Sequence, residues 1–346
     1  MIGIRADAND IVATGHIMRC MTIAKQLSKL GKEVLFFLAD EYGVSMLEEK
    51  ELRYVILHTD WENPMEEIPT LMQEIKAHGI ETMLFDSYRM TKEYFTALGE
   101  QLDGVKLAYI DDLFEDVYPV DLVINYNAYH TQFPYAEEYA KIEGRDVCLC
   151  LGPSYVPLRE EFGRTDLKAG IENSVLLSCG GGDILQSMQG ILEKAVEDER
   201  FHNTVFHVIV GRYHQNKELL EQLAKEHKNI VLHHNVSNMA ELMEENCIAV
   251  SAAGTMLYEL CAMERPTVFY ITADNQRYDS DFFTRDDRML FAGDIRENRE
   301  QCIDCILEGI NALLCDVKKR TIMKEKLRMV TDGKGAVRIA EALAGL

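Results

Sequence analysis

The first 37 residues combine features that few folds can accommodate together. An apolar run at residues 1–4 leads into a polar loop, an apolar-periodic segment covers 17–30, and a second apolar run begins at 34. This order predicts a strand, a loop, a helix and a second strand. The helix should bury one stripe, because its apolar side chains recur every three to four residues at Ile17, Met21, Ala24, Leu27 and Leu30. Gly31 follows directly, where the left-handed backbone that often ends a helix favours glycine.

The same alternation continues along the chain. We expect strands at 53–58, 82–85, 106–110, 121–124 and 147–151, with helices at 64–78 and 91–102. A stretch with two prolines and many charges then interrupts the pattern, which restarts at 174–178. A chain of 346 residues also exceeds the usual size of one core. The prediction is therefore an α/β protein with two Rossmann-like, doubly wound parallel-sheet domains: 1–155, a linker at 156–171, and 172–346, which includes a closing helix.

Charge and cysteine usage narrow the function class. The 58 acidic residues outnumber the 36 basic ones, giving a net charge of −22, which argues against a nucleic-acid or anionic-membrane partner. The nine cysteines are odd in number and lie mostly in apolar runs, which is typical of reduced thiols in the cytoplasm. Cys302 and Cys305 form a CxxC without a second ligand pair, so no metal site is expected. No stretch has the length of a membrane span, and we expect a cytoplasmic protein.

The loop after the first strand is the first candidate site. Thr14, Gly15 and His16 fall at the predicted start of the helix, where free backbone N–H groups favour an anion or a polarised oxygen. His16 is a candidate general base, because histidine is the side chain whose protonation can change near neutral pH, although a histidine here can also simply cap or pack against the helix. Arg19 lies one turn further on and can bind a phosphate or form a structural pair with Asp7.

A glycine-rich turn opens the second half. Gly180, Gly181 and Gly182 follow a strand and precede Asp183 and a helix, so the backbone can approach a ligand closely. A tight strand-to-helix turn would use the same glycines. The turn has neither a Walker lysine nor a complete GxGxxG pattern, so neither a P-loop kinase nor a dinucleotide-binding fold is indicated.

The segment 247–271 is the most informative part of the second half. A strand enters a turn of small residues, Ala252, Ala253 and Gly254, and Thr255 begins a helix whose N-terminus suits a diphosphate. Glu259 lies one turn into this helix, where its carboxylate can accept hydrogen bonds from two ribose hydroxyls. An ion pair of Glu259 with Arg265 is the structural alternative. The amides of Asn275 and Gln276, at the end of the next strand, would reach the same ligand.

Together these residues resemble a known family. The matching positions run in order along almost the whole chain: Arg5, Asp7, Thr14, Gly15, His16, Arg19, Asp86, Tyr88, Asp111, Asp112, Asn125, Asn127, Ala128, Tyr129, Gly152, Ser154, Tyr155, Leu158, Arg159, Glu160, Glu161, Phe162, Gly181, Gly182, Asp183, Ser251, Ala252, Tyr258, Glu259, Ala273, Asn275, Gln276, Asp332 and Ala336. The chain is similar to the PseG/SpsG group of nucleotide-sugar hydrolases, which share the two-domain GT-B fold with the MurG glycosyltransferases. Ser87 and Arg89 depart from the pattern, in which histidine and glycine are usual beside the Asp86 and Tyr88 positions.

The resemblance implies a specific reaction. The family hydrolyses UDP-2,4-diacetamido-2,4,6-trideoxy-β-L-altropyranose to the free sugar and UDP in pseudaminic acid biosynthesis, without a cofactor or metal. It implies that His16 activates water at the anomeric carbon, with inversion, assisted by Tyr88. It implies a sugar side formed by Arg5, Asp7, Gly15, Arg19, Asn127 and Arg159. It implies a UDP side formed by Gly181, Gly182, Asp183, Ala252, Ala253, Gly254, Thr255, Glu259, Asn275 and Gln276. A transferase of the same fold, which passes the sugar to an acceptor, is the alternative.

Overall fold

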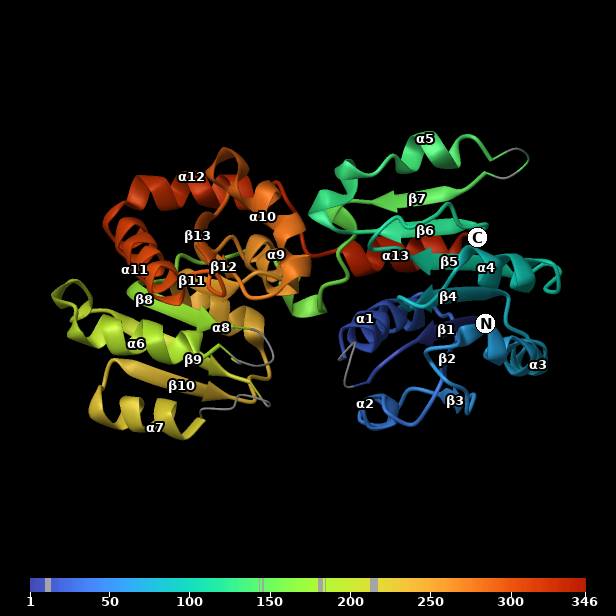
Figure 1. Cartoon of the computed structure of the whole chain (residues 1–346), viewed down its shortest axis with the longest axis horizontal. Coiled ribbons are helices and arrows are strands. Elements are labelled where there is room, and N and C mark those ends of the chain that lie inside the picture. Colours follow the sequence, from blue (N-terminus) through green and yellow to red (C-terminus); the bar gives the residue numbers. More distant parts are fainter. Residues whose placement is uncertain (10–13, 143, 145, 180–182, 184, 212–216) are drawn as a thin grey trace. The chain divides into compact units, whose positions relative to one another are not determined.

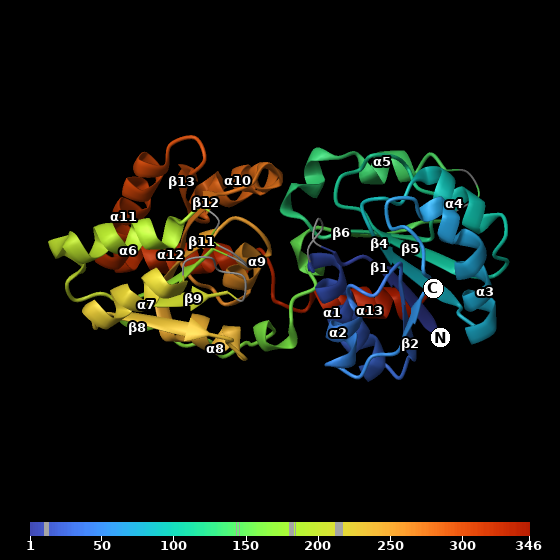
Figure 2. The same cartoon turned by 60° about the horizontal axis from the view of Figure 1, so that its bottom comes forward.

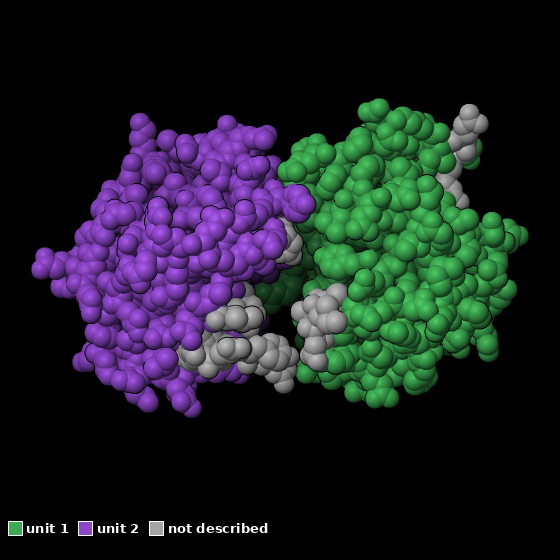
Figure 3. Space-filling model, in the orientation of Figure 1, with its two compact units in different colours: residues 1–160, 334–346 green, residues 161–333 purple. Residues whose placement is uncertain are grey.

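The protein consists of two compact units, each built around a parallel sheet (Figures 1 and 3). We describe residues 1–9, 14–142, 144, 146–179, 183, 185–211 and 217–346 of a computed structural model. The first unit contains 1–160 and 334–346, and the second contains 161–333. Both sheets are parallel throughout their described pairings, which confirms the predicted α/β fold class.

The sheet of the first unit has the strand order β3-β2-β1-β4-β5-β6-β7. Its strands are β1 (Ile2–Ala6), β2 (Val34–Leu38), β3 (Tyr54–Ile56), β4 (Thr82–Asp86), β5 (Lys106–Ile110), β6 (Leu122–Asn125) and β7 (Cys148–Leu151). Its helices are α1 (Gly15–Lys29), α2 (Val44–Glu48), α3 (Ile68–His78), α4 (Lys92–Gly99), α5 (Tyr135–Tyr139) and α13 (Gly335–Ala344). The order reverses at β1, between β2 and β4, and open α/β sheets bind ligands beyond the carboxyl ends of their strands at such a point.

One face of this sheet carries a large apolar core. Side chains that alternate along β2, β4 and β5 pack against α3 and α4, and four aromatic rings at Phe85, Tyr94, Phe95 and Tyr109 meet edge-on or tilted. Burial of rings of this size stabilises a fold by about 1.5–3 kcal/mol each. The core therefore holds the carboxyl ends of β4 and β5 rigidly.

Helix α1 begins at the loop that the sequence singled out. Ile17, Ala24 and Leu27 are fully buried, as the periodicity predicts, and Gly31 has a φ of 75°. Leu30, predicted on the buried stripe, is 45 % exposed because the helix ends at Lys29 and Leu30 is its capping residue.

The closing helix α13 belongs to the first unit, whereas the sequence analysis placed it in the second domain. It packs along α1, and its apolar residues Ala336, Ile339, Ala340 and Leu343 are buried (Figure 2). Its first residue, Gly335, lies so close to the chain that an added Cβ would come within 2.2 Å of the Val156 carbonyl oxygen. This return of the chain to the first unit depends on a long-range backbone contact that periodicity does not reveal.

The sheet of the second unit has the order β10-β9-β8-β11-β12-β13. Its strands are β8 (Ile171–Ser178), β9 (Val205–Val210), β10 (Ile230–His234), β11 (Asn246–Ala252), β12 (Thr267–Ile271) and β13 (Leu290–Asp294). Its helices are α6 (Ser187–Glu197), α7 (Lys217–Glu226), α8 (Met239–Glu245), α9 (Thr255–Ala262), α10 (Arg277–Thr284), α11 (Arg299–Cys315) and α12 (Val317–Arg328). None of the helices in the described part of the chain combines the length and apolar character that crossing a bilayer requires.

Candidate functional site

A histidine–aspartate pair lies at the switch point of the first sheet. His16 comes from the first turn of α1, and Asp86 is the last residue of β4, directly beside β1. The His16 Nδ1 atom is 2.5 Å from Asp86 Oδ1, with the imidazole 4 % and the carboxylate 0 % exposed. Arg19 Nη2, which can only donate, also lies 3.2 Å from the same Nδ1. The Asp86 contact is the shorter one, and because an ionised carboxylate only accepts hydrogen bonds, we assign the proton to Nδ1, which leaves Nε2 as the acceptor nitrogen. This is the tautomer that a general base requires.

Arg19 holds Asp86 in its ionised form. Its Nε donates to Asp86 Oδ2 at 2.6 Å, and its Nη2 donates to Asp86 Oδ1 at 2.5 Å and to Asp112 Oδ2 at 2.9 Å. Burial acts to raise the pKa of Asp86, but the charge of Arg19 and the hydrogen bonds from Arg19 and His16 outweigh it and hold that pKa well below its usual range. The Arg19 guanidinium, which also donates to the Tyr126 hydroxyl, is thus a structural partner of Asp86 and Asp112. The sequence analysis named Asp7 as its partner instead, but Asp7 pairs with Arg5.

Tyr88 provides the exposed edge of the same cluster. Its ring meets the His16 ring edge-on, with centroids 4.5 Å apart, and half of the residue is exposed. Partial burial, and the nearby carboxylate of Asp112, raise the pKa of its hydroxyl. Tyr88 is therefore a neutral hydrogen-bond donor at any ordinary pH, next to the imidazole.

The neighbouring strand ends extend this polar network. Asn127 donates to Asp112 Oδ1 at 2.8 Å and to Asn125 Oδ1 at 3.1 Å. Asp111 accepts hydrogen bonds from the Phe114 backbone N–H at 2.9 Å and from the Tyr135 hydroxyl at 2.8 Å. Its burial outweighs these contacts and raises the pKa of Asp111 to about 6.

That raised pKa predicts a pH-dependent stability. Between pH 4 and 6 the folded state keeps the Asp111 proton while the unfolded chain has released it, so the free energy of unfolding falls as pH rises. A shift of this size corresponds to about 3 kcal/mol. Asn at this position stays neutral, so Asp111→Asn should gain stability relative to the wild type by about that amount from pH 4 to 7. Urea unfolding of the variant and the wild type at each pH measures the difference in their free energies of unfolding. A difference that is independent of pH would contradict the raised pKa of Asp111.

Arg5 and Asp7, predicted on the sugar side, lie in a buried ionic cluster. Arg5 is 0 % exposed, and its guanidinium contacts Glu67 at 2.8–3.0 Å and Asp7 Oδ1 at 2.6 Å. Tyr94 donates to the same Glu67 at 2.7 Å. Arg5 is thus enclosed by protein groups and acts by orienting Asp7, whose second oxygen, Oδ2, accepts no hydrogen bond within the described residues.

The remaining sugar-side residues are Gly15 and Arg159. Gly15 is the exposed first residue of α1, and an added Cβ there would contact none of the described residues within 4 Å. Arg159 is half-buried in the chain segment that ends the first unit, where a role toward substrate stays a prediction.

In the second unit, α9 begins at Thr255, as predicted, and a diphosphate site at its N-terminus stays a prediction. Its N-cap residue, Gly254, has no side chain to cap the helix, and its φ of 153° is a conformation that favours glycine. Ala252 and Ala253 are buried before it, Thr255 is exposed, and Glu259 lies half-buried in the following turn. The alternative partner of Glu259, Arg265, directs its guanidinium to backbone carbonyls of Met263, Asn246 and Lys168.

Two other predicted UDP-side residues make internal hydrogen bonds. Asp183 accepts from the N–H groups of Ser187 and Met188 at 2.8 Å each and so caps α6. Gln276 Oε1 accepts from the Thr272 N–H at 2.8 Å. Gly181 and Gly182 lie outside the described residues, and the Asn275 side chain is likewise outside the description.

Several residues that form the polar networks of the first unit were given no role by the sequence analysis. Asp86, Asp112 and Tyr126 bind Arg19, and Glu67 binds Arg5 from 62 residues away. Asp86 and Asp112 each follow an apolar run in the sequence. Their position at the carboxyl end of a predicted strand was the signal that could have placed them in the site. Nothing in the sequence marks Glu67, which lies in a single turn of 3₁₀ helix, Pro64–Glu67.

Comparisons with known proteins agree with this architecture. No family model matches the chain. It is 21 % identical to the spore coat polysaccharide biosynthesis protein SpsG of Bacillus subtilis, covering 100 % of this chain and 98 % of that one. It is 25 % identical to the UDP-2,4-diacetamido-2,4,6-trideoxy-beta-L-altropyranose hydrolase of Campylobacter jejuni, over 74 % of this chain and 85 % of the other.

Solved structures show the fold. Acinetobacter baumannii MurG aligns with a TM-score of 0.68 at 12 % identity, covering 100 % of this chain and 99 % of that one. Spinosyn rhamnosyltransferase SpnG, solved with thymidine diphosphate, aligns with a TM-score of 0.65 at 12 % identity, over 99 % of this chain and 100 % of that one. The chain is thus a relative of the SpsG and PseG-type sugar-nucleotide enzymes, built on the GT-B fold.

Proposed function

We propose that this protein hydrolyses a UDP-linked 2,4-diacetamido-2,4,6-trideoxyhexose to the free sugar and UDP. The observation that carries the proposal is the contact of His16 Nδ1 with Asp86 Oδ1 at 2.5 Å, at the end of β4. It leaves Nε2 as a base whose tautomer is fixed by a buried carboxylate. The relative from Campylobacter jejuni, whose name states such a hydrolysis, supports the choice of substrate.

In the proposed reaction, water attacks the anomeric carbon while His16 Nε2 takes its proton. The bond from the anomeric carbon to the β-phosphate oxygen breaks, and UDP leaves with the bonding electron pair. Because UDP is a weak base, it leaves without protonation by a carboxylic acid, and the proton stays on the imidazole next to Asp86. Within the second unit, the backbone N–H groups at the N-terminus of α9 are the proposed binding site for the diphosphate.

Tyr88 and the Asp7 carboxylate supply the sugar contacts in this proposal, and Glu259 supplies the ribose contact. Three further residues act indirectly, by holding a carboxylate in place through a hydrogen bond. Arg5 holds Asp7, Arg19 holds Asp86, and Asn127 holds Asp112. No residue role here requires a metal or a cofactor.

The first test of the proposal is UDP release from the diacetamido UDP-sugar, measured with and without added sugar acceptors. Hydrolysis predicts release at the same rate in both. Release that depends on an acceptor would instead establish transfer, the activity named for the rhamnosyltransferase neighbour.

The nucleotide half of the proposal makes its own prediction. Glu259→Ala should weaken UDP binding by about 1–3 kcal/mol, because two ribose hydroxyls lose their acceptor. Titration calorimetry with UDP measures the change. Glu308→Ala, which removes an exposed carboxylate paired with Arg200 in the same unit, is the matched control and should bind UDP like the wild type. An unchanged dissociation constant for Glu259→Ala would remove this residue from the site.

A further inference from the structure

His130 lies at the ligand-binding edge of the first sheet and has no role in the proposed reaction. It belongs to a short 3₁₀ helix, Ala128–Gln132, that follows β6. The carboxyl ends of β1, β4, β5 and β6 share one edge of this parallel sheet. His130 therefore lies beyond the same edge as His16 and Asp86, where open α/β sheets bind their ligands.

A backbone contact fixes the tautomer of the His130 ring. Its Nδ1 atom is 3.0 Å from the Asn127 carbonyl oxygen. A carbonyl oxygen only accepts hydrogen bonds, so Nδ1 of the neutral ring carries the proton and Nε2 presents its lone pair. None of the described residues donates a hydrogen bond to Nε2, and His130 is partly exposed. The ring thus offers an acceptor to a ligand.

Gly152 holds the same ring from the other side. This glycine follows β7 with a φ of 90°, and an added Cβ would lie 2.8 Å from His130 Cε1 and 3.3 Å from Nε2. The Gly152 N–H donates to the Asn125 carbonyl oxygen at 2.8 Å, which fixes the glycine beside the end of β6. The imidazole is therefore held by a hydrogen bond and by packing, and a ligand that binds it has little side-chain motion to arrest.

The carboxylates nearest to His130 along this edge already have donors from the protein. Asp86 accepts from Arg19 Nε at 2.6 Å. Asp112 accepts from Arg19 Nη2 at 2.9 Å and from Asn127 Nδ2 at 2.8 Å. Asn127 thus connects His130, through its carbonyl group, to the network around the proposed base. The strands β4 and β6 are two strand spacings apart, about 10 Å.

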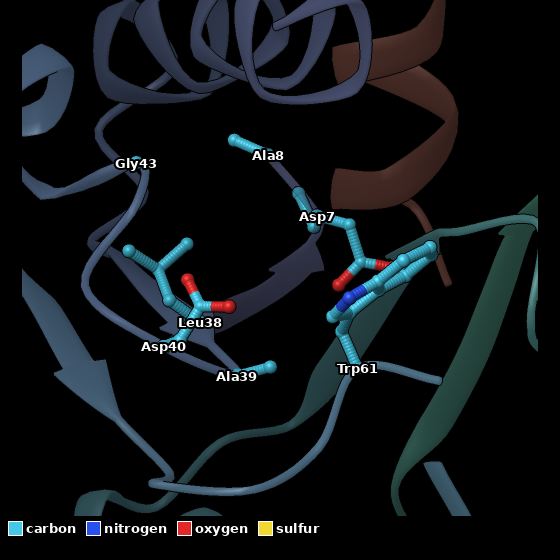
Figure 4. Close-up of a pocket in the computed structure, with 8 residues that line it drawn as sticks. Asp7, Ala8, Leu38, Ala39, Asp40, Gly43 and Trp61 are labelled. Carbon is cyan, nitrogen blue, oxygen red and sulfur yellow. The ribbon is translucent and has the colours of Figure 1, made fainter. Parts of the chain in front are cut away.

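The opposite end of the edge has little room for a sugar. Beyond β1 and β2, the recess lined by Asp7, Leu38, Ala39 and Trp61, among others, has space for about one water molecule (Figure 4). A substituent of a hexose does not enter it. The hydrogen-bond donors of a bound sugar therefore need further acceptors along the edge.

We propose that His130 binds the sugar by accepting, at Nε2, a hydrogen bond from an N–H or O–H group of the hexose. A 2,4-diacetamido-2,4,6-trideoxyhexose linked through its anomeric oxygen carries two amide N–H groups and one hydroxyl, and a neutral imidazole nitrogen accepts from either kind of donor. His130 takes no proton in the reaction. This inference rests on the proposed function for its ligand, and it adds a residue on which the affinity for the sugar depends.

The test compares the affinities for the diacetamido UDP-sugar and for UDP, measured by titration calorimetry in the His16→Ala background, in which the sugar persists. His130→Asn keeps a donor for the Asn127 carbonyl oxygen but loses the acceptor at Nε2. The dissociation constant of the UDP-sugar should rise about three- to tenfold, the effect of one hydrogen bond, while that of UDP changes less than about twofold. An unchanged dissociation constant for the UDP-sugar would overturn the proposal.

Two further variants separate the acceptor from the packing of the ring. His130→Gln can place its amide oxygen near the position of Nε2, and it should bind the UDP-sugar nearly as well as the parent protein. His130→Phe keeps a ring against Gly152 without either nitrogen, and it should weaken binding as much as His130→Asn. Equal losses in all three variants would assign His130 a packing role and overturn the proposal. If His130→Asn fails to fold, the comparison of His130→Gln with His130→Phe decides.

The failure of this inference differs from the failure of the proposed function. Hydrolysis by the wild type, with UDP-sugar affinities that do not depend on residue 130, would remove only the role of His130. An affinity that depends on His130, in a protein that releases UDP only when an acceptor is present, would remove only the hydrolase.

Discussion

His16→Ala should lower the turnover number for UDP release by about 10²–10⁴-fold while the affinity for UDP stays the same. The reason is that the variant loses the only nitrogen proposed to take the proton of the attacking water, whereas all the proposed UDP contacts are residues of the second unit. Single-turnover kinetics with the diacetamido UDP-sugar measures the chemical step, and calorimetry with UDP measures binding.

His78→Ala is the matched control for this experiment. His78 ends α3 on the surface of the same unit and lies 3.3 Å from Glu74 one turn earlier. His78→Ala should leave the turnover number for UDP release and the dissociation constant for UDP near those of the wild type. Turnover in His16→Ala comparable with the wild type would refute the role of the imidazole as base.

Asp86→Asn is expected to have an effect of similar size, about 10²–10⁴-fold on turnover. An asparagine amide can present an N–H group to His16 Nδ1, which stabilises the tautomer with its proton on Nε2. That tautomer cannot accept a proton from water at Nε2. The shape of the site would be nearly unchanged, so the loss should appear in kcat, measured by initial rates at saturating substrate.

Asp86→Asn also removes a charge from Arg19, and a second variant separates this effect. Asp112 binds the same guanidinium at 2.9 Å, but the His16 ring bonds to Asp86 instead. Asp112→Asn should therefore cost clearly less turnover than Asp86→Asn. Equal losses in the two variants would show that Arg19 pairing, and not the tautomer of His16, is what matters.

The fold followed from the sequence because parallel α/β sheets repeat one local pattern. The apolar runs between polar loops became strands, and β1, α1 and β2 fall where the first 37 residues predicted them. Short helices carry too few turns to show a period, and α2 and α5, of five residues each, were not predicted. The assignment of α13 failed for another reason, since its partner α1 is some 300 residues away in sequence.

The candidate site was predictable in position but only partly in its contacts. The carboxyl ends of parallel strands share one edge of a sheet, so their positions after apolar runs were the available signal that Asp86 and Asp112 lie near the loop of His16. Arg5 shows the limit, because the alternation of a strand does not reveal that Glu67 and Asp7 enclose its guanidinium. The stacking of Arg89 on Trp61 joins two loops, whose paths depend on tertiary packing and not on local pattern.

The most direct test of hydrolysis at the anomeric carbon is the reaction in ¹⁸O-labelled water. The enzyme is incubated with UDP-2,4-diacetamido-2,4,6-trideoxy-β-L-altropyranose, and both products are analysed at once by mass spectrometry. Attack at the anomeric carbon by water predicts one ¹⁸O atom in the free sugar and none in UDP. Label in UDP would show that water attacks phosphorus. Free sugar that is absent without an acceptor, together with UDP release once an acceptor is added, would show transfer. Either result would contradict the account.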